Sequence, residues 1–233
     1  ITSTGIGVTI GAGGNPGTTE YAIQFGSSYV QANGTLAGGQ IWQTAAVWGS
    51  PMSVTGLTPA TSYTVSITAR NGVETATSSS TTVSTLVATP TVSTSNVANT
   101  TMSVTIGTET NSSSAQYSIQ FGSSYVQANG TIAGGQIWQT AAVWGSPISV
   151  TGLTPATSYV VTVIAKNPDG SISNGTSSSS TNYTLANVPS APTVTAVSSS
   201  SINAVINENS NPAATEFSIQ IGSNYVRANG TLN

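Results

Sequence analysis

Side chains able to perform acid–base or metal chemistry are scarce in this chain. Its 233 residues contain six carboxylates and three basic side chains, and they contain neither histidine nor cysteine. The carboxylates are Glu20, Glu74, Glu109, Asp169, Glu208 and Glu216. A glycosidase needs a pair of carboxylates at a fixed separation, but no carboxylate position recurs in all copies of the repeat described below. We therefore predict no catalytic residue, no cofactor, no metal ligand and no enzymatic activity.

The low charge excludes further classes of protein. Charged residues make up 4% of the chain, against about 25% in an average soluble domain. Three basic residues cannot follow a nucleic-acid backbone, and no run approaches the roughly 18 apolar residues that span a membrane. The hydrophobic share of 37% nevertheless suffices for packed cores, so we do not expect disorder.

Large aromatic side chains are the remaining candidates for a binding role. They occur in two matching sets of three, which are Tyr29, Trp42 and Trp48, then Tyr125, Trp138 and Trp144. Exposed rings would suit stacking on sugars, whereas buried rings would fill a core or a domain junction, and aromatics usually do the latter. A contact between neighbouring chains is the third alternative.

The two sets match because the chain is repetitive. Residues 21–71 and 117–167 differ at only eight of 51 positions, with an offset of 96 residues, and a third copy begins at Phe217. A period near 100 residues is too long for a helical solenoid and suits small domains in a row. The expected domains are repeat 1 (residues 1–86, without its first strand), repeat 2 (residues 87–187, complete) and repeat 3 (residues 188–233, the N-terminal part).

Each repeat has the sequence pattern of a β-sheet protein. Apolar and polar residues alternate through Met102, Val104 and Ile106, and such runs are separated by turn sequences such as Asn129-Gly130. No stretch has the 3.6-residue period of a helix. Short strands with frequent turns predict tandem all-β Greek-key sandwiches, each of seven strands, with the last one incomplete.

A long spaced pattern occurs in both full copies. Its residues are Leu57, Pro59, Thr61, Tyr63, Val65, Ile67, Ala69 and Asn71, and then Leu153, Pro155, Thr157, Tyr159, Val161, Val163, Ala165 and Asn167. The pattern resembles the corner between strands E and F of fibronectin type III domains, and residues 188–192 resemble the proline-rich entry to strand A. This resemblance implies that Tyr63 and Tyr159 are tyrosine-corner residues, whose hydroxyls bond to the backbone a few residues upstream.

The chain departs from this family at strand B. Fibronectin type III domains usually carry a tryptophan there, but this chain has Ile10, Ile106 and Ile206. We expect Trp42 and Trp138 to supply the missing bulk. The segment WQTAAVWG is most similar to bacterial versions of the domain.

Three Asn-Gly-Thr triplets are candidate sites of N-glycosylation, at Asn33, Asn129 and Asn229. Hairpin-turn chemistry and duplication explain the same recurrence, so both interpretations stay open.

Near-identical tandem copies suit a protein that must be long and uniform in geometry, whereas an enzyme needs only one copy of its catalytic site. We expect a structural component of an extracellular or cell-surface filament, stalk or adhesin. Its partners would be copies of itself, with surface glycans as a second candidate. The alternatives are a spacer or weak sugar-binding region of a secreted polysaccharide-degrading enzyme, and a phage fibre module. We expect either the continuing polypeptide or a neighbouring chain to cover the apolar residues of repeat 3.

Overall fold

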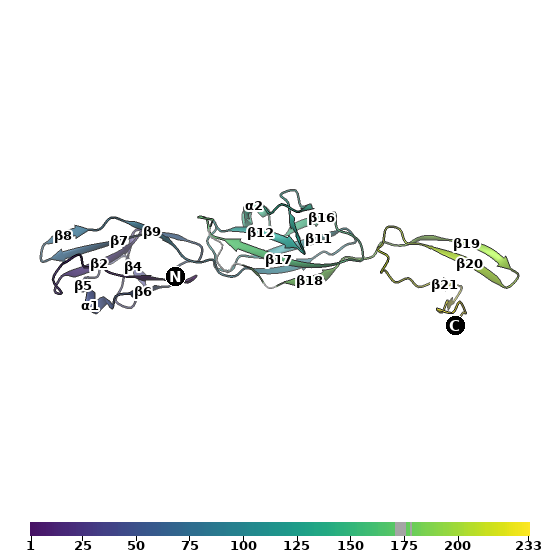
Figure 1. Cartoon of the computed structure of the whole chain (residues 1–233), viewed down its shortest axis with the longest axis horizontal. Coiled ribbons are helices and arrows are strands. Elements are labelled where there is room, and N and C mark those ends of the chain that lie inside the picture. The colour runs from purple at the N-terminus through teal and green to yellow at the C-terminus, as the bar shows by residue number, and fades with distance from the viewer. Residues whose placement is uncertain (171–175, 178) are drawn as a thin grey trace.

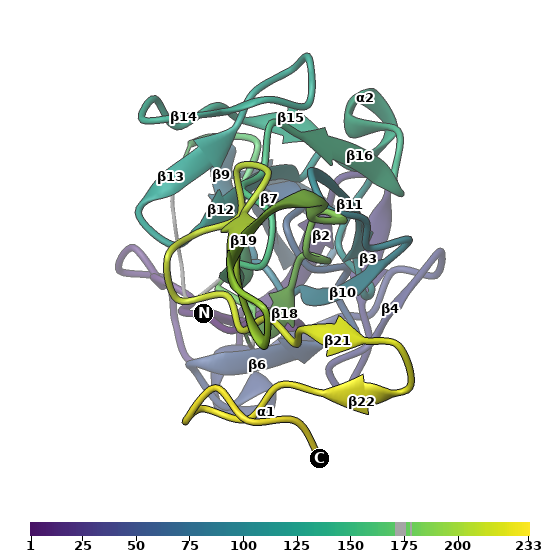
Figure 2. The ribbon, with the colours of Figure 1, turned by 90° about the vertical axis from the view of Figure 1, so that its right-hand side faces the viewer.

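The computed structural model describes residues 1–170, 176–177 and 179–233. The chain forms three units that follow one another along a long axis (Figure 1). Seen along that axis, the three units overlap (Figure 2). The fold class predicted from the sequence, tandem all-β sandwiches, is confirmed by the sheets described next.

Repeat 2 is a sandwich of two antiparallel sheets. The first sheet has the order β10 (Thr91–Ser95), β11 (Thr101–Gly107) and β16 (Ile148–Thr151). The second has the order β14 (Ile132–Ala133), β13 (Ser124–Val126), β12 (Gln116–Phe121), β17 (Ser158–Lys166) and β18 (Ser180–Tyr183), with β15 (Gln139–Thr140) also paired to β12. These are nine strands among the described residues rather than the seven expected. The expectation missed β14 and β15, which are too short to show any alternation.

Alternation along the strands builds the core between the two sheets. Met102, Val104 and Ile106 of β11 are buried, as are Val161 and Val163 of β17, while their neighbours face outward. Burying a side chain of this size stabilises a fold by about 1.5–3 kcal/mol. All these residues belong to one cluster of buried apolar side chains.

Repeat 1 has the same architecture without a counterpart of β10. Its first sheet contains only β1 (Gly5–Val8) and β6 (Met52–Thr55). Its second sheet contains β4 (Leu36–Ala37), β3 (Ser28–Val30), β2 (Glu20–Phe25), β7 (Ser62–Asn71) and β8 (Glu74–Thr77), with β5 (Gln43–Thr44) on β2 and β9 (Thr81–Ser84) on β7.

Repeat 3 is a pair of hairpins. The strands are β19 (Ser190–Ser198), β20 (Ser201–Asn207), β21 (Gln220–Ile221) and β22 (Asn224–Tyr225). β21 has two residues where β12 has six, because the described chain offers it no counterpart of β17 to pair with. The apolar positions of β20 are accordingly exposed: Ile202 is 47% exposed, whereas its counterpart Met102 is 0% exposed.

Two short helices were not expected from the sequence. They are α1 (Ala45–Trp48) and α2 (Ala141–Trp144). Thr44 and Thr140 cap them by accepting a hydrogen bond from the backbone N–H three residues on, at 3.4 Å. Four residues are too few to show a helical period, and the only available signal was the capping threonine with a glycine five residues later.

The Asn-Gly-Thr triplets form tight turns, and in repeats 1 and 2 these turns close over strand β6 or β16. Asn129 accepts hydrogen bonds from the backbone N–H and the hydroxyl of Thr131, and the Thr151 N–H donates to the Gly130 carbonyl at 2.9 Å. Gly130 has a φ of 81°, and a Cβ there would collide with the Ser149 carbonyl oxygen. The same asparagine–threonine bonds form at Asn33 and Asn229. All three asparagines are exposed, and their glycosylation stays a prediction.

We predict that Gly130→Ala lowers the stability of repeat 2 by at least about 1–2 kcal/mol, which is the cost of a left-handed φ at a residue with a Cβ. Urea unfolding with fluorescence detection measures the change. Gly134→Ala is the matched control, because a Cβ at Gly134 meets no atom within 4 Å and its φ is not left-handed. Equal effects of the two substitutions would contradict this account of the turn.

Candidate functional site

Trp48 and Trp144 lie in the two cores. They are 3% and 6% exposed. Each indole Nε1 donates a 2.8 Å hydrogen bond to a backbone carbonyl of the neighbouring strand, that of Tyr21 or Tyr117. The helical turns α1 and α2 direct these rings inward from the end of each turn. Both rings are therefore structural and present no face to a ligand.

Trp42 and Trp138 lie outside the cores. They are partly exposed and belong to neither cluster of buried side chains. The Arg70 guanidinium lies 4.4 Å from the centre of the Trp42 ring, and Lys166 Nζ lies 4.7 Å from that of Trp138. The expectation that these two tryptophans replace the family's strand-B tryptophan is therefore wrong. They directly precede β5 and β15 at the edge of the second sheet. The helical turns α1 and α2 place Trp48 and Trp144, instead, in the cores.

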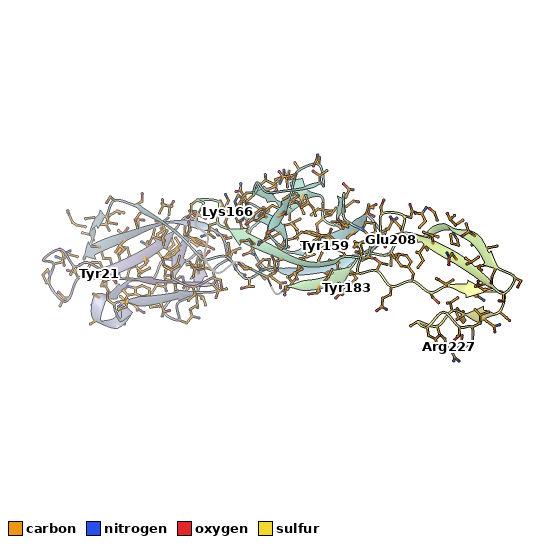
Figure 3. The ribbon with its side chains drawn as sticks, turned by 45° about the vertical axis from the view of Figure 1, so that its right-hand side comes forward. Tyr21, Tyr159, Lys166, Tyr183, Glu208 and Arg227 are labelled. Atoms are coloured by element: carbon orange, nitrogen blue, oxygen red, sulfur yellow. The ribbon has the colours of Figure 1, made fainter. Side chains whose placement is uncertain are left out.

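The tryptophan–cation stacks differ in charge between the two copies. Arg70 Nε also donates to Glu20 Oε2 at 2.6 Å, whereas Gln116 stands at the position that corresponds to Glu20 in repeat 2. A cation–π contact at an exposed site contributes about 0.5–1 kcal/mol. In each stack one face of the indole is covered by the cation, which leaves less of the ring for a sugar. Figure 3 shows Lys166 at the end of repeat 2 that adjoins repeat 1.

Tyr29 and Tyr125 are half-buried on β3 and β13. Tyr29 pairs with Gln24 near one end of β2, while the Trp42 neighbour Gln43 pairs with Tyr21 near the other end. Among the described residues, no ring contact joins Tyr29 or Tyr125 to a tryptophan. The six candidate aromatics are thus not gathered into one site.

The hydroxyls of Tyr63 and Tyr159 bond to the backbone upstream. Each accepts a 2.9 Å hydrogen bond from an N–H five residues earlier, that of Thr58 or Thr154. The Tyr159 ring packs against Phe121, with ring centres 5.8 Å apart. This is the geometry that the resemblance implies for a tyrosine corner.

Sequence reasoning missed a buried threonine that holds the same corner. Thr184 Oγ1 donates to the Thr154 carbonyl at 2.6 Å and accepts from the Thr157 N–H at 3.0 Å. Thr85 makes the equivalent bonds in repeat 1. Both threonines are nearly inaccessible. They stand among many Ser and Thr residues, so no sequence signal separated them.

Sequence reasoning also missed the asparagines that hold the junctions between repeats. Asn111 Oδ1 accepts from the Ala88 N–H at 2.7 Å, and Asn111 Nδ2 donates to the Ala88 carbonyl at 2.9 Å. Asn211 makes the same pair of bonds to Asn187, with the same lengths. We call each arrangement an asparagine clamp. The available signal was the recurrence of an asparagine 100 residues on, together with Glu109 and Glu208 just before it.

Further contacts hold the linker to the preceding repeat. The Ala60 N–H donates to the Leu86 carbonyl, and the Ala156 N–H donates to the Leu185 carbonyl, both at 3.1 Å. Ala60 of repeat 1 is fully buried in the core cluster of repeat 2. At the first junction the Ser112 N–H also donates to the Pro59 carbonyl.

The second junction replaces that last bond. Pro212, which stands where repeat 2 has Ser112, has no N–H to donate. There Asn99 Nδ2 donates to Asn187 Oδ1 at 2.5 Å instead. Glu208 lies beside this junction (Figure 3). Each linker is therefore fixed on both sides by hydrogen bonds between uncharged groups.

The Tyr117 phenol lies buried near the first asparagine clamp. Burial raises its pKa above the ordinary value, the Asn111 side chain offsets part of this, and the Glu109 carboxylate raises the pKa further. No hydrogen bond of ordinary geometry reaches the hydroxyl.

In the part of the chain that the structure describes, the Asp and Glu side chains form no group of three that could hold a metal ion. The helices of this part are all too short to cross a membrane.

No family model and no curated protein matches the chain. Solved structures similar to it include a segment of two fibronectin type III domains from chicken tenascin. That likeness has 18% identity and a TM-score of 0.45, and it covers 79% of this chain and 93% of the other. Another is the FN1–FN3 region of chicken CNTN1, at 15% identity and a TM-score of 0.28 over 79% of this chain; the match spans 61% of that structure.

We predict that Tyr159→Phe destabilises repeat 2 by about 0.5–1.5 kcal/mol, because the Thr154 N–H loses its acceptor. Chemical denaturation measures the loss. Tyr125→Phe is the control, since the structure gives the Tyr125 hydroxyl no hydrogen bond, and it should change stability by less than about 0.5 kcal/mol. A larger loss for the control would show that the corner hydrogen bond is not what matters.

We also predict that repeat 2 loses stability as the pH rises above about 10, the ordinary pKa of a tyrosine. The folded state raises the pKa of Tyr117, so the unfolded state ionises first and the full contribution is present only below that pH. Denaturation midpoints across alkaline pH test this. In Tyr117→Phe the alkaline loss should be smaller, and an unchanged loss would refute the role of Tyr117.

Proposed function

We propose that this chain is a segment of an elongated structural protein outside the cell, such as a bacterial-type filament, stalk or adhesin. The observation that carries the proposal is the repeated asparagine clamp. Two asparagines 100 residues apart, Asn111 and Asn211, hold the linkers before repeat 2 and repeat 3 with hydrogen bonds of equal length. A junction that repeats in this way holds each domain against the preceding one in the same manner. A string of such domains would then act as a spacer of defined length.

The composition supports the same proposal. A surface with few charges creates little electrostatic repulsion between copies, so strings of these domains can lie against one another. The proposed partners are therefore copies of the chain itself. No catalytic role is proposed, because no carboxylate position recurs in all copies of the repeat. The four tryptophans are either buried in a core or covered on one face by a cation.

A weak carbohydrate-binding role is the second candidate. One observation favours it, namely that a partly exposed tryptophan with a stacked cation recurs in repeats 1 and 2. Such a surface would suit an accessory region of a secreted polysaccharide-degrading enzyme. Binding to insoluble polysaccharides that is lost in a Trp42→Ala, Trp138→Ala double variant would favour this candidate.

We predict that Asn111→Ala loosens the first junction without unfolding either repeat. The change removes both bonds to Ala88, so small-angle scattering should show a wider distribution of overall dimensions. The unfolding midpoints of the two repeats should change little by comparison.

Asn15→Ala is the matched control. Asn15 occupies the equivalent loop position in repeat 1, is exposed, and has no linker to hold in this chain. Its substitution should leave the scattering profile unchanged. A flexible parent chain, or a parent and Asn111→Ala with the same profile, would refute the rigid-array proposal.

A further inference from the structure

Four Asn-Gly pairs lie in the part of the chain that the structure describes. They are Asn33-Gly34, Asn71-Gly72, Asn129-Gly130 and Asn229-Gly230. Such a pair is able to react with itself, because glycine has no Cβ to keep its backbone nitrogen away from the asparagine side chain. All four asparagines are exposed, so exposure does not separate them. Their hydrogen bonds, however, differ.

The turns of the Asn-Gly-Thr triplets hold three of these pairs. At the first, Asn33 Oδ1 accepts hydrogen bonds from the Thr35 N–H and hydroxyl at 3.1 and 2.8 Å, and the Gly34 N–H donates to the Gln31 carbonyl at 2.9 Å. The other two triplets form equivalent bonds. In repeats 1 and 2 the glycine is also buried. The nitrogen that would attack is therefore already bonded, and reaction must wait until the turn opens.

Asn71-Gly72 lies in a different turn, the two-residue loop between β7 and β8. Asn71 ends β7 and pairs with Glu74, which begins β8. Gly72 is exposed with a φ of 70°, a Cβ there would meet no atom within 4 Å, and Val73 is 98% exposed. Among the described residues, no hydrogen bond reaches the Asn71 side chain or the Gly72 N–H. The two reacting groups are therefore not held apart.

Repeat 2 has no such pair at the equivalent position. Asn71-Gly72 is replaced there by Asn167-Pro168, and proline has no N–H to lose. Asn167 is also only 1% exposed. Two otherwise near-identical repeats thus differ in the chemistry open to this asparagine.

We propose that Asn71 is a site of spontaneous deamidation. The Gly72 backbone nitrogen loses its proton and forms a bond to the side-chain carbonyl carbon of Asn71. The bond from that carbon to the side-chain nitrogen breaks, and the nitrogen leaves as ammonia with the proton. Water then opens the resulting succinimide ring at either of its carbonyl carbons, which gives aspartate or isoaspartate. The inference goes beyond the proposed function and does not depend on it.

The product changes the β7–β8 hairpin. A carboxylate at Asn71 would face Glu74 across the two strands, and like charges directly opposite each other are destabilising. Isoaspartate would in addition lengthen the main chain at the turn. All four residues of β8 are exposed and β8 pairs with β7 alone among the described strands, so we expect β8 to loosen while the core of repeat 1 stays intact. Each event also makes the net charge more negative than −3, which increases the repulsion between copies.

Peptide mapping by mass spectrometry tests the proposal. The folded chain is incubated at mildly alkaline pH and digested with a protease that works in acid. Each Asn-Gly peptide is then analysed for the mass change from amide to acid and for isoaspartate. We expect Asn71 to convert at least about tenfold faster than Asn33 or Asn129, because those two react only while their turns are open.

Two controls separate the effect of structure from that of sequence. In concentrated urea the turns are lost, so Asn71, Asn33 and Asn129 should convert at similar rates. Asn71→Gln should abolish the conversion in the β7–β8 peptide, since glutamine would have to form a larger and less favourable ring. Native isoelectric focusing should accordingly show an acidic form that accumulates faster in the parent than in Asn71→Gln.

Three results would overturn the proposal. The first is a folded chain in which Asn71 converts no faster than Asn33 and Asn129. The second is a preference for Asn71 that persists unchanged in urea, which would assign it to sequence alone. The third is an acidic form that accumulates equally in the parent and in Asn71→Gln. The scattering test of Asn111→Ala is independent of all three, so their outcome leaves the rigid array standing.

Discussion

The structure depends on apolar contact between the two sheets of each sandwich. With so few charged residues, ion pairs contribute little, and the partly exposed Arg70–Glu20 pair is worth at most about 1 kcal/mol. Where both sheets are complete, as in repeat 2, the facing rows on β11 and β17 are almost fully buried. Where one sheet is reduced, the same alternation leaves apolar residues exposed, as Ile202 shows in repeat 3. The burial of the apolar residues in each repeat therefore depends on how much of the opposite sheet is present.

Hydrogen bonds between uncharged groups then position one sandwich relative to the next. The asparagine clamp uses a side-chain amide, which can donate and accept at once, to satisfy both backbone groups of a linker residue. A charged side chain could not do this, because a carboxylate only accepts and an ammonium only donates. The clamp is therefore suited to a chain that avoids charge, and it fixes the linker without needing a counter-ion.

The fold was predictable because period-two alternation and a repeat of about 100 residues extend over the whole chain. The backbone contact of Tyr63 and Tyr159 followed from a resemblance to a known family rather than from the residues alone. The roles of the tryptophans were not predictable. Trp42 and Trp48 lie in one short segment whose sequence shows no periodic pattern that separates them. The helix α1 decides which ring points inward, and its four residues are too few to give a periodic signal.

The asparagine clamp was hidden for a different reason. Its partner is the main chain of Ala88 or Asn187, and a backbone partner leaves no mark on the residue type at that position. Asn111 consequently looks like any polar loop residue. Only the comparison of two junctions separates it from the many other polar residues of the chain.

The differences between the two copies act as a natural mutagenesis experiment on the outer face. From repeat 1 to repeat 2 the carboxylate of Glu20 becomes the amide of Gln116, and Arg70 becomes Lys166. The tryptophan and a stacked cation are present in both. The stack in repeat 2 thus forms without a carboxylate at the position of Glu20, and the contact between a cation and an indole face is present in both copies. In both copies the basic residue covers one face of a partly exposed tryptophan at the edge of the second sheet. In repeat 1 the Glu20 carboxylate also pairs with Arg70, but the stack of repeat 2 forms without a carboxylate at that position.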